Sequence, residues 1–151
     1  MIGVKLLDEP EAFRNRVIAL HQSYCLHVDS RDISGIMGLY HEDAKVDFGR
    51  DFTANGSNEL RTLFTKLLNS CANTSHHVSN IVCNVTDMTG TAYIMAWHRF
   101  HESNQTDLVV YGRYIDSYIL EDGDLKITSR VLNVHGSTSP MPFNILKRRS
   151  G

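Results

Sequence analysis

The feature that most constrains the fold is a change in the hydrophobic period near residue 76. Before this point apolar residues recur every three or four positions, which is the spacing of one face of an α-helix. After it apolar and polar residues alternate, as they do along strands with one buried face. The alternating part divides into four predicted strands at 76–86, 91–101, 107–120 and 125–135. Because only short turn-like segments separate them, we expect an antiparallel meander.

Three helices are predicted in the part of the chain before the strands. The first begins near Pro10, and its apolar stripe is Phe13, Val17, Leu20, Tyr24 and Val28. A short second helix follows with Asp32 as a candidate cap, then a short strand over 44–48, and a third helix opens at Ser57. Helices followed by strands predict an α+β fold, in which three helices cover a curved antiparallel sheet and leave a cavity open at one end.

Length and composition indicate a single domain over residues 1–151, with a core from about 10 to 136 and a C-terminal strap or lid over 137–151. The net charge of -2 gives no reason to expect nucleic acid as a partner, and no apolar run has transmembrane length, so no membrane partner is expected. The three cysteines have no CxxC spacing. With no apolar leader, they predict reduced thiols in a cytoplasmic protein.

The strand at 91–101 is apolar on both faces. One face carries Ala92, Ile94, Ala96, His98 and Phe100, and the other carries Tyr93, Met95, Trp97, Arg99 and His101. The helices can cover only one of these faces. A second copy of the chain would cover the other, so we expect a homodimer or homotrimer.

Five polar residues do not fit a plain apolar core. Tyr24 lies on the apolar stripe of the first helix, and Asp29 lies where that helix ends. His76 opens a strand, His98 shares a face with small apolar residues, and Arg130 alternates with buried positions. We expect several of them to converge on the cavity.

Each of these residues also has a purely structural interpretation. Asp29 could cap the second helix, and His76 could be an exposed residue at a strand start. His98 could be a core histidine bonded to a carbonyl, Tyr24 a core aromatic, and Arg130 half of a salt bridge between subunits. No metal site is expected, because neighbouring strand residues face opposite ways and no helix-spaced ligand pair is present.

Several short motifs resemble those of SnoaL-like domains in the nuclear-transport-factor-2-like superfamily. They are 24–32, 44–48 with Gly56, 74–80 and 112–116, and the likeness extends over about residues 12 to 135. The resemblance implies a cone-shaped, cystatin-like α+β roll around a pocket. Within the superfamily the chain is similar to scytalone dehydratase-like enzymes and to related dehydratases and dehydrochlorinases.

The same resemblance implies roles for individual residues. Asp29 and His76 match a catalytic aspartate–histidine dyad, and His98 and Tyr24 match further catalytic positions. The substrate-binding positions that we expect are Phe48, Asn80, Asp116, Tyr118 and Arg130. Four positions depart from the pattern of scytalone dehydratase: Val28 and Phe48 stand where it has tyrosines, and Asp116 and Tyr118 where it has serine and asparagine.

The implied function is a cofactor-independent lyase that acts on a small organic molecule, cyclic or polyketide- or steroid-like, by a dehydratase-like elimination. His76 would act as the base, with Asp29 orienting it, while His98 and Tyr24 donate hydrogen bonds. Three alternatives remain open: a ketosteroid-type isomerase in the same pocket, a module that only binds a ligand or dimerises, and a subunit of a multicomponent oxygenase.

Overall fold

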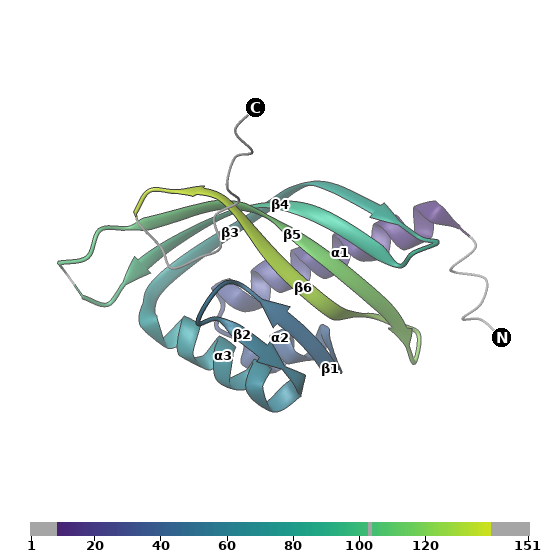
Figure 1. The fold of residues 1–151 in the computed structure, drawn as a ribbon, viewed down its shortest axis with the longest axis horizontal. Helices are drawn as coiled ribbons and strands as arrows, with labels where there is room; N and C mark the ends of the chain where they lie inside the picture. The colour runs from purple at the N-terminus through teal and green to yellow at the C-terminus, as the bar shows by residue number, and fades with distance from the viewer. Residues whose placement is uncertain (1–8, 103, 140–151) are drawn as a thin grey trace.

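The computed structural model describes residues 9–102 and 104–139 and has three helices on one side of a six-stranded sheet (Figure 1). In chain order the elements are α1 (Pro10–Asp29), α2 (Ile33–Gly38), β1 (Tyr40–Asp47), β2 (Thr53–Asn55), α3 (Gly56–Ser70), β3 (Cys71–Asn84), β4 (Thr89–Phe100), β5 (Leu108–Glu121) and β6 (Asp124–Ser137). The strand order is β2-β1-β6-β5-β4-β3, so the sheet is open, with β2 and β3 at its edges. The predicted α+β class is confirmed.

The sheet is mixed, which differs from the expected antiparallel arrangement at one pair. The four long strands form the predicted antiparallel meander. β1, however, pairs in parallel with β6, with Val46 opposite Arg130. Along the chain these two strands are separated by β2, α3 and β3–β5. A parallel pair requires such a long crossover.

The stripe predicted on α1 is buried as expected, and the polar residue His21 is buried with it. The neighbouring helix α2 is capped by Asp32, whose side chain accepts a hydrogen bond of 2.8 Å from the backbone N–H of Gly35. Because Asp32 caps this helix, the interpretation of Asp29 as the cap of α2 is wrong. The carboxylate of Asp29 is instead directed toward β3.

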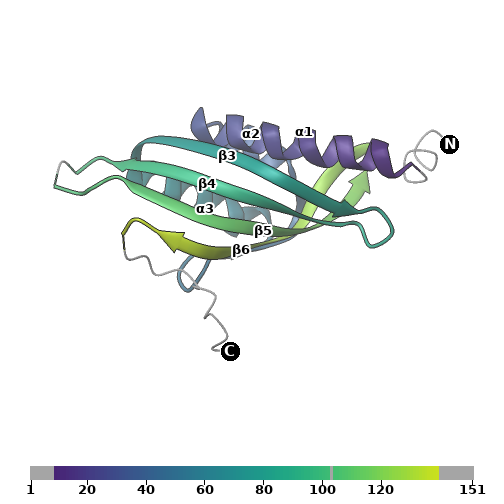
Figure 2. The same cartoon turned by 90° about the horizontal axis from the view of Figure 1, so that it is seen from above.

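The helices cover the inner face of the sheet in two places. α1 runs lengthwise beside β3, as seen from above in Figure 2. α3 packs against β1 and β2 and buries its apolar face, made of Leu60, Leu63, Phe64 and Leu68. The space left between α1, α3 and the long strands is where the cavity described below lies.

A bulge interrupts the alternation of β3. The register with β4 shifts between Ser79 and Val82, and Asn80 has a φ of 51°. An inserted residue turns every later side chain to the opposite face. Beyond the bulge Ile81 packs against the core, whereas Val82 is 67% exposed.

Within the described residues no helix is both long and apolar enough to cross a membrane. Most of the predicted strap or lid, residues 140–151, lies outside the residues that the structure describes.

Candidate active site

A cavity of about 280 Å³ lies between α1, α3 and the inner faces of the long strands. Aromatic and aliphatic side chains form most of its wall. Phe48, predicted as a substrate contact, is part of this wall, and its ring lies 6.1 Å from that of Phe64. Among the predicted catalytic residues, Tyr24, His76 and His98 all line the cavity.

Asp29 and His76 are in direct contact. The Nδ1 atom of His76 lies 2.7 Å from an oxygen of Asp29, and the backbone N–H of His76 donates to the other oxygen at 2.9 Å. The hydroxyl of Thr74 donates a third hydrogen bond to this carboxylate, also at 2.9 Å. The end of α1 and the first half of β3 therefore hold the pair in one orientation.

These hydrogen bonds determine the charge state of the pair. Partial burial by itself raises the pKa of Asp29, but the hydrogen bonds and charge of His76 and the bond from Thr74 bring it below its usual value. Asp29 therefore stays ionised at neutral pH and can only accept hydrogen bonds. It follows that Nδ1 of His76 is the donor, which leaves Nε2 as a proton acceptor.

His98 lies next to the dyad on β4. Its ring centroid is 5.5 Å from that of His76, and the two rings are nearly perpendicular. Burial, and after it the charge on His76, lowers the pKa of His98 to about 4. His98 is therefore a neutral imidazole at physiological pH, and its buried Nδ1 atom has no hydrogen-bond partner among the described residues.

Tyr24 and Tyr114 each contribute a phenolic hydroxyl to the cavity wall, and their ring centroids lie 5.8 Å apart. Burial raises the pKa of both hydroxyls well above the usual value, and the nearby charge of Arg130 offsets this only in part. Both tyrosines are therefore neutral and able to donate a hydrogen bond to a ligand oxygen.

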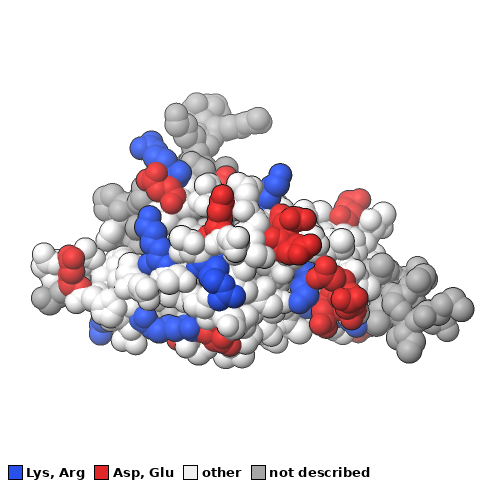
Figure 3. Space-filling view, turned by 90° about the horizontal axis from the view of Figure 1, so that it is seen from below, with Lys and Arg blue, Asp and Glu red and all other residues white. Residues whose placement is uncertain are grey.

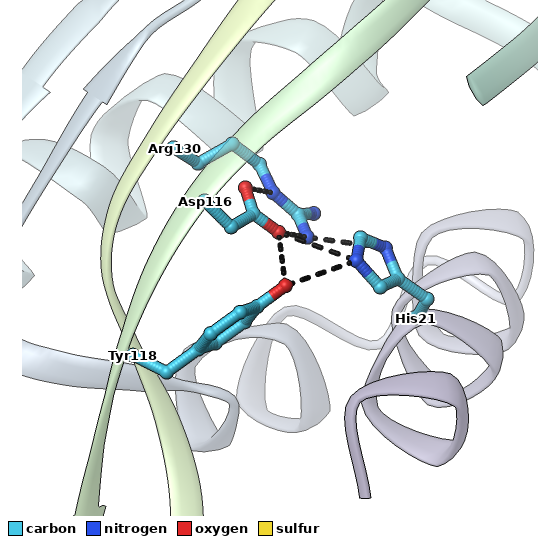
Figure 4. A network of polar contacts seen from close by, with 4 residues as sticks. All are labelled: His21, Asp116, Tyr118 and Arg130. Carbon is cyan, nitrogen blue, oxygen red and sulfur yellow. Dashed lines mark hydrogen bonds and ion pairs between the residues drawn. The ribbon is translucent and has the colours of Figure 1, made fainter. Parts of the chain in front are cut away.

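Behind this wall lies a second polar cluster, formed by His21, Asp116, Tyr118 and Arg130 (Figure 4). Arg130 donates two hydrogen bonds to Asp116, at 2.9 and 2.7 Å, and both side chains are fully buried. Tyr118 donates to the same carboxylate at 3.1 Å. His21 reaches it from α1 at 3.3 Å, so that the helix contacts the ion pair that Arg130 and Asp116 form on the sheet.

The position of this cluster corrects the expectation that Asp116, Tyr118 and Arg130 contact a ligand, because none of them lines the cavity. All three face inward, but they lie further along their strands, where α1 packs directly on the sheet. The guanidinium of Arg130 lies 4.4 Å from the ring centroid of Tyr24 and 4.2 Å from that of Tyr114. These two rings separate Arg130 from the cavity.

Asn80 is also outside the cavity, because the bulge in β3 leaves its side chain exposed.

Two residues at or near the cavity were not predicted from the sequence. His21 is three residues from Tyr24, so its place on the apolar stripe of α1 was the signal for a buried histidine. Lys66, on the exposed side of α3, borders the cavity, and no sequence pattern distinguishes it from other surface lysines.

A model of the SnoaL-like domain matches residues 12–131. The chain belongs to the SnoaL-like domain family. This SnoaL-like protein therefore shares the family predicted from its motifs, and its mixed sheet is the family's cone-shaped α+β roll. Among curated proteins, none matches the sequence.

Solved structures show the same fold around different chemistry. A candidate scytalone dehydratase from Novosphingobium aromaticivorans is 24% identical, with a TM-score of 0.80 over 89% of this chain and 93% of that one. A candidate aromatic ring hydroxylase from the same species is 20% identical, with a TM-score of 0.76 over 90% and 96%. A hexachlorocyclohexane dehydrochlorinase from Novosphingobium barchaimii is 16% identical, with a TM-score of 0.74 over 89% and 94%. Since the names of these proteins give different activities, the function has to be argued from the site.

Proposed function

We propose that this SnoaL-like protein is a cofactor-independent lyase that eliminates water, or a comparable leaving group, from a small cyclic organic molecule. The observation that carries the proposal is the contact of 2.7 Å between Asp29 and His76 at the wall of an apolar cavity. A histidine held by an ionised carboxylate, with its second nitrogen free to accept a proton, is an arrangement suited to general base catalysis. Two of the neighbours with the same fold are a candidate dehydratase and a dehydrochlorinase, which agrees with an elimination.

In the proposed mechanism Nε2 of His76 removes a proton from a carbon beside a carbonyl group. The resulting imidazolium is stabilised by Asp29, which stays ionised. The electron pair of the broken C–H bond forms the new double bond as the hydroxyl group departs. That hydroxyl takes a proton back from His76, so the substrate loses one water molecule and the dyad returns to its starting state.

His98 and Tyr24 would stabilise the negative charge that develops on the carbonyl oxygen. Both line the cavity, and both are neutral at physiological pH. Neutral donors fixed in an apolar site stabilise an enolate without having to reorganise during the reaction. The role of His98 requires that the ring nitrogen bearing its proton faces the ligand.

A ketosteroid-type isomerase would begin with the same proton abstraction, and analysis of the product separates it from a lyase. A module that only binds a ligand would have no need for a hydrogen-bonded dyad, so the contact between Asp29 and His76 argues against it.

The experiment uses cyclic β-hydroxyketones, whose dehydration gives a conjugated enone that absorbs in the ultraviolet. We expect Asp29→Asn and His76→Ala each to lower kcat/KM by about 10²–10⁴-fold. The double variant should be little worse than either single one, because the two residues act as a unit. His77→Ala is the matched control, since this neighbouring histidine is exposed and outside the cavity. Defects that multiply in the double variant would contradict the shared role.

A further inference from the structure

The charges around the cavity are unevenly distributed. Lys66 is the one lysine or arginine among the described residues that line it, and no aspartate or glutamate lines it. Within the described part of the chain, no carboxylate lies within ion-pair distance of Lys66. Its Nζ atom lies 5.6 Å from the ring centroid of Phe52, which also belongs to the wall. Lys66 is thus an unpaired cation placed at the exposed rim.

The rest of the cavity offers no competing charge to a ligand. The tyrosines and His98 are neutral at physiological pH, and aromatic and aliphatic side chains form most of the remaining wall. Asp29, which contacts the cavity residue His76, already accepts hydrogen bonds from Thr74 and from both the ring and the backbone of His76. An anionic ligand therefore gains an attraction at the rim, and a cationic ligand meets only repulsion there.

The attraction is local, because the face on the side of α3 has no continuous basic field. Lys and Arg side chains are interspersed there with Asp and Glu (Figure 3). Exposed charges further from the cavity than about a Debye length are largely screened by salt. The charge of Lys66 itself, next to an apolar wall, is therefore what favours an anionic ligand over a cationic one.

We propose that Lys66 determines the charge preference of this cavity, and that its ligand is a one- or two-ring hydrophobic carboxylate. The rings would lie against the aromatic wall, and the carboxylate would meet Lys66 at the rim. A volume of about 280 Å³ lies just below the usual range of about 300–1,000 Å³ for small-molecule sites, which fits a small ligand of one or two rings. That the reactive carbon of this ligand would face His76 rests on the proposed function. The charge preference of the cavity can be measured without turnover.

The test uses two probes of the same shape, 2-naphthoate and 2-naphthamide, with the full chain in isothermal titration calorimetry. The wild type should bind the carboxylate more tightly than the amide, and added salt should reduce the difference. Lys66→Gln should weaken 2-naphthoate about threefold to fivefold and leave 2-naphthamide unchanged, as expected for a partly exposed ion pair. Lys66→Glu should reverse the preference.

Arg61→Gln is the matched control, because Arg61 is an exposed cation on the same helix that does not line the cavity. It should affect neither probe. The proposal is overturned if the wild type binds both probes equally, if Lys66→Gln weakens both alike, if Arg61→Gln has the same effect as Lys66→Gln, or if neither probe binds. The preference should persist in His76→Ala, so failure of the lyase proposal is distinguishable from failure of this one.

Discussion

Two carboxylates that contact a histidine between helix and sheet, Asp29 and Asp116, have different partners and different exposure. The side chain of Asp29 is 30% exposed and is paired with a histidine that can change its charge. The side chain of Asp116 is fully buried and is paired with Arg130, whose charge is permanent. The first arrangement can take part in proton transfer, and the second holds its charges fixed.

Breaking the buried ion pair should be costly. Asp116→Asn keeps the shape of the side chain but leaves the charge of Arg130 uncompensated in the core, so we expect a loss of about 3–5 kcal/mol in the free energy of unfolding. Urea denaturation measures it. Asp107→Asn is the control, since Asp107 forms a similar two-bond pair with Arg99 at the surface, and it should change stability far less.

Replacing both members of the pair tests the cause. The double variant Asp116→Leu/Arg130→Met removes both charges, and it should recover much of the stability that Asp116→Asn loses. If Asp116→Asn is no worse than Asp107→Asn, the ion pair does not have the stabilising role described here.

His21, which is buried, and His98, which is partly buried, should make stability depend on pH. Burial, followed by the charge of Arg130, lowers the pKa of His21 to about 4, and burial likewise lowers that of His98 to about 4. Unfolded histidine titrates near 6.5, so between these values the unfolded chain binds more protons. Stability should therefore decrease as the pH falls from about 6.5 to 4, by up to about 3 kcal/mol for each histidine.

Urea denaturation at pH 7 and pH 5 measures this effect. His98→Gln should make the decrease between the two pH values smaller. His77→Gln, a change to an exposed histidine on β3, should leave the decrease as it is in the wild type. An unchanged decrease in His98→Gln would mean that His98 is not kept neutral by the fold.

At the level of elements, the bulge in β3 decides which residues beyond Ser79 face the core. From Asn73 to Ser79 the pairing with β4 is regular, and this places Thr74 and His76 beside Asp29. At Asn80 the backbone enters the left-handed region, which asparagine tolerates better than most residues. The bulge therefore keeps Asn80 at the surface and turns Ile81 toward the core.

The effect of a substitution at Asn80 on the free energy of unfolding should depend on the backbone conformation there and not on side-chain contacts. Asn80→Gly should be neutral or slightly stabilising, whereas Asn80→Val should lower the free energy of unfolding by about 1–2 kcal/mol. Ser79→Val, at the adjacent exposed position with no positive φ, is the control and should be tolerated. Thermal or urea unfolding checks the order of the three variants. Equal effects of the two valine substitutions would show that the bulge is not strained by a branched side chain.

On the scale of the whole molecule, the outer face of the sheet lacks a cover within the described residues. Tyr93, Met95, Tyr111 and Ile115 are between 37% and 47% exposed. Met95 lies opposite Tyr111 in the pairing of β4 with β5, so their side chains form one apolar surface. We propose that a second copy of the chain covers this surface, as the two apolar faces of β4 predict.

Charge introduced on that surface should separate the subunits. Sedimentation velocity should give a dimer or trimer for the wild type and a monomer for Tyr111→Glu, because burying an unpaired carboxylate in an apolar interface is unfavourable. Leu26→Glu is the control, since Leu26 is 71% exposed on α1, away from the sheet, and it should leave the assembly intact. A monomeric wild type at micromolar concentration would contradict the proposal.

Periodicity alone determined the larger part of this architecture: the helical stripe of α1, the four long strands, and the inner face of β4 that carries His98. These are local properties, because the direction of each side chain follows from its position in a repeat of 3.6 or 2 residues. The motifs also indicated that Asp29 and His76 would meet, at the end of a helix and the start of a strand.

Only the tertiary structure decided how far along each strand the cavity extends. Tyr114 and Asp116 are two residues apart on the same face of β5, yet one lines the cavity and the other is buried in an ion pair. The difference comes from α1, which packs on the sheet at His21 and leaves space beside Tyr24. The parallel pairing of β1 with β6 likewise depends on contacts between segments far apart in the chain, for which no local pattern exists.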